Sequence, residues 1–278
     1  MPATSAKPLK AFRGQLVLAG AGKMGGAMLA GWLKRGLDPK HATVIEPAPS
    51  KAITALKRRG LTLNPPKARG TAAVIVVGVK PQIAPDALPP LASRAGKGTL
   101  VVSIMAGRTI DFLQKSFPSG TAVVRAMPNL PASIGRGMTV AVANKNVTSA
   151  QRKLADTLLS ASGAVEWVSD EKLLDAVTAV SGSGPAYVFL LAETLAAAAV
   201  EAGLPKTLAT KLARETIAGS GELLRQSTLE AAVLRQNVTS PGGTTAAALE
   251  VLMGPGGFET LLATAVAKAT KRSRELAG

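Results

Sequence analysis

A glycine-rich turn near the amino terminus is the first place where residue types and spacing indicate chemistry. Gly20, Gly22 and Gly25 follow the apolar run Gln15–Ala19 and precede a helix-like stretch. Glycines at this spacing allow a tight turn, a close approach of backbone N–H groups to a pyrophosphate, and close packing of helix on strand. The turn therefore predicts a bound dinucleotide. The cofactor contacts expected here are Gly20, Ala21, Gly22, Lys23, Met24 and Gly25.

The end of the second predicted strand bears on which dinucleotide binds. Glu46 lies 21 residues after Gly25, where an acidic side chain bonds the 2′-hydroxyl of the adenosine ribose and favours NAD. An exposed side chain that Pro47 directs away from the ligand is the alternative. The neighbouring residues that would instead favour a 2′-phosphate are Ser50, Lys51, Arg58 and Arg59. The residues alone leave this choice open.

Further polar residues follow other predicted strands. Ligands of open α/β sheets bind outside the carboxyl ends of the strands, so Lys80 and the Asn129 amide are candidates to contact the cofactor. Each has a plainer interpretation, because Lys80 could be a solvated lysine and Asn129 could belong to a structural turn fixed by its two neighbouring prolines. The cofactor contacts expected at these strand ends are Val79, Lys80, Pro81, Ala106 and Asn129.

A second glycine-rich segment, Asn237–Thr245, precedes a helix in the last third of the chain. Backbone N–H groups and hydroxyls at a helix start form an anion site that suits a carboxylate. A single Ser or Thr at such a position is usually an ordinary helix cap. Two glycines, a proline and three hydroxyls exceed what a cap requires, so the segment predicts a binding site.

Two kinds of architecture have to position these segments. Short β-branched runs alternate with helix-like stretches up to about residue 170, and several runs are apolar throughout, as in strands covered on both faces. This pattern predicts an α/β Rossmann-like domain with a doubly wound, mainly parallel sheet. The remainder is rich in Ala, Leu and Glu with almost no strand candidates. We therefore expect a flexible extension over 1–13, a dinucleotide-binding domain over 14–170 and an all-helical domain over 171–278.

Charge separates the same two regions. The net charge is +16, with 23 basic and 7 acidic residues up to residue 170 and ten of each afterwards. Such basicity suits nucleic acid, an anionic membrane or an anionic cofactor. The basic residues are scattered, and aromatic residues make up 3% of the chain, so stacking platforms for single-stranded nucleic acid are missing. We expect no nucleic-acid partner.

Cysteine and histidine usage narrows the chemistry further. The chain has no Cys and one His, which excludes disulfide scaffolds, thiol nucleophiles, iron–sulfur clusters and a Ser–His–Asp triad. We expect no metal site. The most apolar stretch, Pro185–Val200, is interrupted by Glu193 and falls short of the ~20 apolar residues of a membrane span. We therefore expect a cytoplasmic protein without a membrane segment. Its Ala-rich helix would be buried either against a second subunit or within one chain.

Several segments together carry a family resemblance. In order, they are GAGKMG, VKP, MPNLPA, DAVTAVSGSGPAY, VTSPGGTTAAAL and RSREL, and they extend from about residue 15 to residue 275. The chain resembles the Δ1-pyrroline-5-carboxylate reductase family. The resemblance implies a nucleotide-binding domain followed by a helical dimerisation domain, with homodimers that assemble into a larger ring. It also implies reduction of the cyclic imine 1-pyrroline-5-carboxylate to L-proline, the last step of proline biosynthesis, with NADPH as cofactor and NADH as a possible alternative.

The resemblance also implies roles for individual residues. The Thr245 hydroxyl would be catalytic and would bond the ring nitrogen, while Glu171 would line the substrate pocket and Asn237 would contact the cofactor. The substrate-binding set is Glu171, Ser240, Gly242, Gly243, Thr244 and Thr245. Hydride transfer to a protonated imine depends largely on positioning, which agrees with the scarcity of Cys and His. Glu46 departs from the uncharged or basic residues often found in this family.

Two other functions compete with this one. A dehydrogenase for a β-hydroxyacid would need a lysine general acid in the helical domain, but Lys172, Lys206 and Lys211 lie in no Gly- or Asn-flanked motif. A reductase for a six-membered imine is a close variant. A non-catalytic protein that senses nucleotides or binds nucleic acid would use the basic surface, and the complete Asn237–Thr245 segment argues against it.

Overall fold

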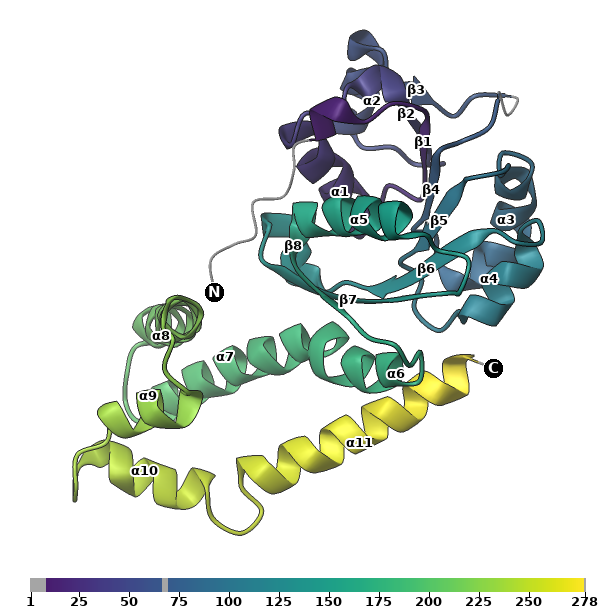
Figure 1. Cartoon of the computed structure of the whole chain (residues 1–278). Coiled ribbons are helices and arrows are strands. Elements are labelled where there is room, and N and C mark those ends of the chain that lie inside the picture. The colour runs from purple at the N-terminus through teal and green to yellow at the C-terminus, as the bar shows by residue number, and fades with distance from the viewer. Residues whose placement is uncertain (1–8, 67–69, 278) are drawn as a thin grey trace. The chain divides into compact units, whose positions relative to one another are not determined.

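The computed structural model describes residues 9–66 and 70–277 and divides into two compact units (Figure 1). The first unit contains the described residues up to Gly182 together with the end of the chain from Thr270, and the second contains Ser183–Ala269. Residues 1–8 of the expected flexible extension lie outside the described residues. From Leu9 on that expectation is wrong, because Leu9 is buried and its N–H donates to the Arg35 carbonyl at 2.8 Å.

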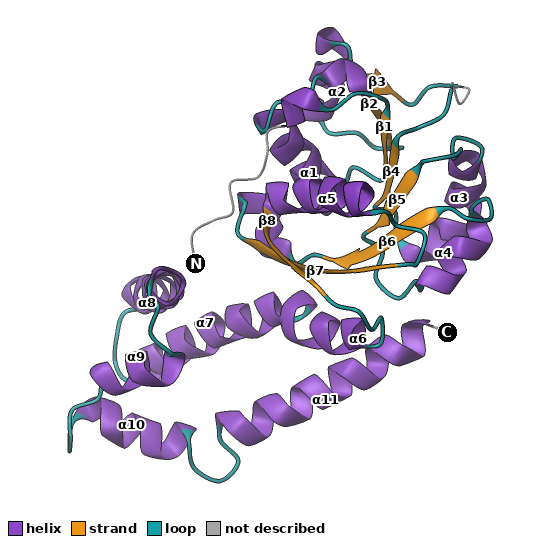
Figure 2. Cartoon of the chain, in the orientation of Figure 1, coloured by secondary structure: helices purple, strands orange, loops and turns teal. Residues whose placement is uncertain are grey.

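The described part of the first unit forms a sheet of eight strands in the order β3-β2-β1-β4-β5-β6-β7-β8 (Figure 2). All neighbouring strands are parallel except β6 and β7. This confirms the predicted doubly wound, mainly parallel sheet. The strands are β1 (Leu16–Ala19), β2 (Ala42–Ile45), β3 (Thr62–Leu63), β4 (Val74–Val77), β5 (Leu100–Ser103), β6 (Ala122–Met127), β7 (Gly137–Ala143) and β8 (Gly163–Trp167).

Helices cover both faces of this sheet, which explains why its strands are apolar throughout. Leu16 and Leu18 of β1 pack in one hydrophobic core, whereas Val17 and Ala19 pack in the other. The helices of this unit are α1 (Lys23–Lys34), α2 (Lys51–Ala55), α3 (Ala84–Ala92), α4 (Ile110–Ser116), α5 (Ser149–Leu159) and α6 (Leu173–Val177).

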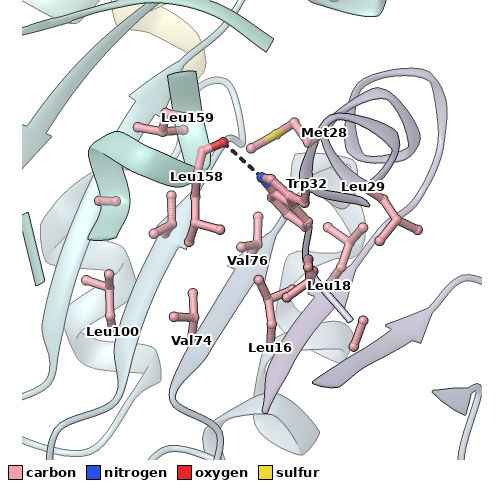
Figure 3. Packing of buried hydrophobic residues seen from close by; sticks show 14 of the residues in the cluster. Leu16, Leu18, Met28, Leu29, Trp32, Val74, Val76, Leu100, Leu158 and Leu159 are labelled. Atoms are coloured by element: carbon pink, nitrogen blue, oxygen red, sulfur yellow. Dashed lines mark hydrogen bonds between the residues drawn. The ribbon is translucent and has the colours of Figure 1, made fainter. Parts of the chain in front are cut away.

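The core beneath α1 fixes the glycine turn in place. Figure 3 shows Met28, Leu29 and Trp32 of α1 packed over the strands, and the Trp32 indole donates to the Leu158 carbonyl of α5 at 2.8 Å. Trp32 is fully buried, so its N–H has to find a partner inside the protein. The start of α1 is therefore held firmly at the carboxyl end of β1.

The described residues of the second unit form helices joined by turns, without strands, and the unit packs only part of its apolar surface. It contains α7 (Gly184–Glu201), α8 (Lys206–Gln226), α9 (Ala231–Asn237), α10 (Thr244–Leu252) and most of α11 (Phe258–Ala277). No residue of α7 is buried, and Phe189 and Leu190 are each 58% exposed. An apolar surface of this extent indicates a partner.

The apolar character of this region corrects one expectation from the sequence, namely that its most apolar stretch falls short of a membrane span. By length and composition the stretch Leu173–Glu201 is apolar enough to cross a membrane. Glu193 and Glu201 do not bring its mean hydropathy below that of a span. By length and composition alone, either lipid or protein could cover this stretch.

Candidate functional site

The three glycines of the turn after β1 have distinct surroundings. Gly20 has φ +85°, and a Cβ there would collide with the Gly78 carbonyl; one at Gly25 would collide with the carbonyl of Gly20. At Gly22, by contrast, no heavy atom lies within 4 Å of the position a Cβ would occupy. The first and third glycines thus allow close packing within the protein, and the second leaves open space for a ligand.

The helix that follows the turn suits an anion. α1 begins at Gly22 without a side-chain cap, and its first turn contains no acidic residue, so its first N–H groups and its positive dipole end are available. A pocket of about 580 Å³ adjoins this helix start, and its lining includes Gly22, Lys23, Ala48 and Ser50. The residues present therefore fit a dinucleotide pyrophosphate.

The remaining residues expected to bind the cofactor in this unit converge at one edge of the sheet. Val79–Pro81 follow β4, Ala106 follows β5 and Asn129 follows β6. These strands are neighbouring and parallel to β1, so their carboxyl ends meet (Figure 2). The Arg108 guanidinium donates to the Pro81 carbonyl at 2.9 Å and ties two of these loops together. Lys80 is exposed.

Asn129 has a clear structural function. Its Oδ1 accepts from the Met138 N–H at 2.8 Å, and its Nδ2 donates to the Ser181 hydroxyl at 3.2 Å. These bonds hold the start of β7 and a π-helical turn, Thr178–Gly182. One N–H and one lone pair of the amide remain, so its contact with a cofactor stays a prediction.

Glu171 is bound within the first unit. Its Oε1 accepts from the Ile110 N–H at 2.8 Å and from Arg125 Nη1 at 2.6 Å. The Arg125 side chain is 7% exposed and that of Glu171 28%. Arg125 was not predicted from the sequence, although a charged residue inside the apolar strand AVVRAM was a usable signal. One carboxylate oxygen of Glu171 thus links Ile110 of α4 to Arg125 of β6. The place of Glu171 in the substrate pocket stays a prediction.

Glu46 lies at the glycine turn. Its Oε2 accepts from the Ala21 N–H at 2.8 Å and its Oε1 from the Ala48 N–H at 3.0 Å. The alternative that Pro47 directs this side chain away from the turn is therefore wrong. The carboxylate lies between the turn after β1 and the segment after β2.

The segment Asn237–Thr245 lies in the second unit between α9 and α10. Gly242 has φ +67°, and the Gly243 N–H donates to the Ser240 carbonyl at 3.0 Å, so the chain turns tightly into α10. Among the described residues, no side chain caps α10, and the hydroxyls of Ser240, Thr244 and Thr245 make no hydrogen bond. Ordinary capping does not account for these hydroxyls, and they are available to a ligand.

The structure thus groups the expected residues into two sets, one in each unit. The glycine turn, the strand-end residues and Glu171 belong to the first unit, and Asn237 belongs with the hydroxyl-rich turn in the second. Within residues 9–66 and 70–277, no group of three His, Asp or Glu side chains is placed to hold a metal ion.

Comparison with known proteins gives consistent matches along the chain. Residues 171–276 match the family model of pyrroline-5-carboxylate reductase dimerisation, and residues 15–107 match that of coenzyme F420-dependent NADP oxidoreductases. A pyrroline-5-carboxylate reductase from Synechocystis is 42% identical over 265 residues, which cover 94% of this chain and 98% of that protein.

Comparison with solved structures gives matches of the same kind. A pyrroline-5-carboxylate reductase from Coxiella burnetii matches with a TM-score of 0.85 and 33% identity, covering 95% of this chain and 99% of that one. A pyrroline carboxylate reductase from Plasmodium falciparum, solved with NADP bound, matches with a TM-score of 0.79 and 29% identity, covering 96% and 99%. The similarity therefore includes both units.

Proposed function

The chain belongs to the pyrroline-5-carboxylate reductase family, and on that premise we propose that it reduces 1-pyrroline-5-carboxylate to L-proline, the last step of proline biosynthesis. It is an NAD(P)-dependent oxidoreductase of that family. The observation that carries the proposal is that full-length relatives match a chain in which both the glycine turn and the hydroxyl-rich turn are open to ligands.

For the cofactor, we assign the pyrophosphate to the uncapped start of α1 and the rest of the dinucleotide to the neighbouring strand ends. When bound, the reduced nicotinamide supplies the hydride. Gly22 leaves room for close approach, and Lys23 adds a positive charge to the pocket. The assigned contacts are Gly20, Ala21, Gly22, Lys23, Met24, Gly25, Val79, Lys80, Pro81, Ala106, Asn129 and Asn237.

For the substrate, we assign the carboxylate to the backbone N–H groups and hydroxyls of Ser240, Gly242, Gly243 and Thr244. The Thr245 hydroxyl bonds the ring nitrogen. The imine carbon accepts the hydride and the nitrogen keeps its proton, so the C=N double bond becomes a single bond. Because the substrate carries its own activating proton, the residues contribute mainly binding and orientation. We also assign Glu171 to the substrate-binding residues.

For assembly, we propose a homodimer formed through the helical unit, since its family model is a dimerisation domain and α7 is unburied. Association of dimers into a larger ring and a cytoplasmic location are further predictions. Light scattering of the purified protein measures the first, and fractionation of the source cells measures the second.

The proposed function is tested by mixing the purified protein with 1-pyrroline-5-carboxylate and either NADH or NADPH. We expect the absorbance of the reduced nicotinamide to fall while proline accumulates. Thr245→Ala should lower kcat by roughly tenfold or more, because it removes a bond that strengthens as charge shifts at the ring nitrogen.

Thr210→Ala is the matched control, since Thr210 is an exposed threonine of α8 whose hydroxyl bonds only its own helix. It should keep the wild-type kcat. Absence of cofactor oxidation with both dinucleotides would refute the proposed function. An unchanged kcat for Thr245→Ala would remove Thr245 from its role while leaving the function intact.

A further inference from the structure

Glu46 follows β2 and bonds the glycine turn, and the structure fixes it from several sides. Each carboxylate oxygen accepts one backbone N–H, from Ala21 in the turn after β1 and from Ala48 in the turn after β2. A carboxylate that bridges two loops in this way cannot swing aside without breaking both bonds. The carboxylate is therefore held in place between the two turns.

Asn64 holds the backbone of the same residue. The Glu46 N–H donates to Asn64 Oδ1 at 2.8 Å, and Asn64 Nδ2 donates to the Glu46 carbonyl at 2.9 Å. Asn64 has φ +46°, and among the described residues other than glycine it is alone in having a positive φ. Asparagine tolerates this conformation better than most residues. Glu46 is thus positioned through its main chain as well as its side chain.

The free capacity of the carboxylate suits a hydroxyl donor. A carboxylate only accepts hydrogen bonds, and each oxygen has two lone-pair positions. One position on each oxygen of Glu46 is filled by an N–H, so one on each remains for the 2′- and 3′-hydroxyls of a ribose. A 2′-phosphate offers no such donor and would bring a second negative charge against the first.

The surroundings offer little to offset that repulsion. Glu46 forms no ion pair within the described part of the chain. The segment after β2 lines the pocket with Ala48 and Ser50, and the cation in the lining is Lys23. Lys51, Arg58 and Arg59 made a 2′-phosphate attractive from the sequence, but none of them forms an ion pair with Glu46.

We propose that Glu46 makes this reductase favour NADH over NADPH. The inference deepens the proposed function, since it rests on the dinucleotide site assigned there. Both cofactors share the pyrophosphate that the start of α1 accommodates, so the difference between them arises at the ribose.

The test uses two fragments that lack the nicotinamide, so that binding is measured apart from catalysis. Calorimetry of the full-length protein with ADP-ribose and with 2′-phospho-ADP-ribose should show at least tenfold tighter binding of ADP-ribose. Glu46→Gln keeps the length and one acceptor but removes the charge. It should tighten binding of 2′-phospho-ADP-ribose by about tenfold and weaken binding of ADP-ribose.

Glu166→Gln is the matched control. It removes one negative charge from an exposed residue of β8, which lies at the opposite edge of the same sheet from β2 and β3, and it should leave both affinities unchanged. A wild-type protein that binds 2′-phospho-ADP-ribose as tightly as ADP-ribose, or more tightly, overturns the inference, as does failure to bind either fragment. If ADP-ribose is favoured but the imine is not reduced, the proposed function fails while the inference holds.

Discussion

At the scale of single residues, the pair Arg125–Glu171 is expected to matter most for stability. Arg125 is almost fully buried in β6, and Glu171 supplies its counter-charge and accepts the Ile110 N–H as well. Glu171→Ala should therefore lower the free energy of unfolding by about 3 kcal/mol, since it leaves a buried charge without a partner. Urea unfolding followed by far-UV circular dichroism measures the change.

Two further variants show how much of this loss of stability comes from the burial of the Arg125–Glu171 pair. Lys115→Ala breaks an exposed pair with Asp111 and should cost less than about 1 kcal/mol. Glu171→Gln retains an acceptor for the Ile110 N–H and should cost less than Glu171→Ala. Equal losses for Glu171→Ala and Lys115→Ala would show that the Arg125–Glu171 pair contributes no more than a surface pair.

The residues that could be predicted from the sequence are those whose chemistry is local. Gly20, Gly22 and Gly25 lie within one turn, and Ser240 and Gly243 within another, so spacing alone was enough to predict them, and their binding roles stay predictions. The partners of Glu171 could not be identified, because Ile110 and Arg125 lie 61 and 46 residues away. Such pairs form only once the sheet has brought distant segments together.

At the scale of elements, strands and helices were largely predictable because burial and capping leave local patterns. Thr148 and Gln151 form a capping box at α5, for example. The exceptions are β3, which has two residues and little burial, and the π-helical turn Thr178–Gly182. A Cβ at Gly182 would lie 2.7 Å from Met127 Cε, so this turn depends on a tertiary contact that no local pattern reveals.

The start of α1 is the element to which we assign the pyrophosphate of the cofactor. Gly22 has φ −66°, which an alanine adopts readily, and its missing side chain faces open space. Gly22→Ala should therefore leave the urea midpoint within experimental error while weakening ADP-ribose binding by at least tenfold, because the methyl group occupies the space that the pyrophosphate needs. Calorimetry measures the affinity.

Gly219→Ala provides the matched control, since Gly219 lies within α8 with no heavy atom near its missing Cβ. It should preserve ADP-ribose affinity. If Gly22→Ala bound ADP-ribose as well as the wild type does, the glycine turn would not be the pyrophosphate site.

At the scale of the whole molecule, the helical unit requires a partner. Its formal charges cancel from residue 171 onward, and α7 leaves its large apolar side chains uncovered. Leu190→Glu should shift the molar mass measured by light scattering toward the 28.2 kDa of one chain, because a glutamate in an apolar interface is buried without a counter-charge.

Thr207→Glu places the same charge at an exposed polar position in the first turn of α8, where it favours the helix dipole. It should keep the mass of the wild type. A Leu190→Glu protein of unchanged mass would place the subunit interface elsewhere.

The division of the chain shows what composition can and cannot predict at this scale. The change in charge and residue type near residue 170 separates an α/β region from a helical one. The compact units divide after Gly182, and the chain from Thr270 returns to the first unit, where the Ser273 hydroxyl donates to Asp175 at 2.7 Å. Because this packing depends on the contacts of a few residues, it cannot be predicted from composition.

Because the chain from Thr270 packs with the first unit, that unit cannot form all its contacts until this part of the chain has been synthesised. The ribosome makes residues 183–269 before it makes the last turns of α11, and at about 5–20 residues per second this takes roughly 4–17 s. Throughout that interval Asp175 lacks Ser273, and the loop at Gly107 lacks the chain at Leu276 that packs against it. The nucleotide-binding unit therefore gains its last contacts only after residues 183–269 of the helical unit have been made.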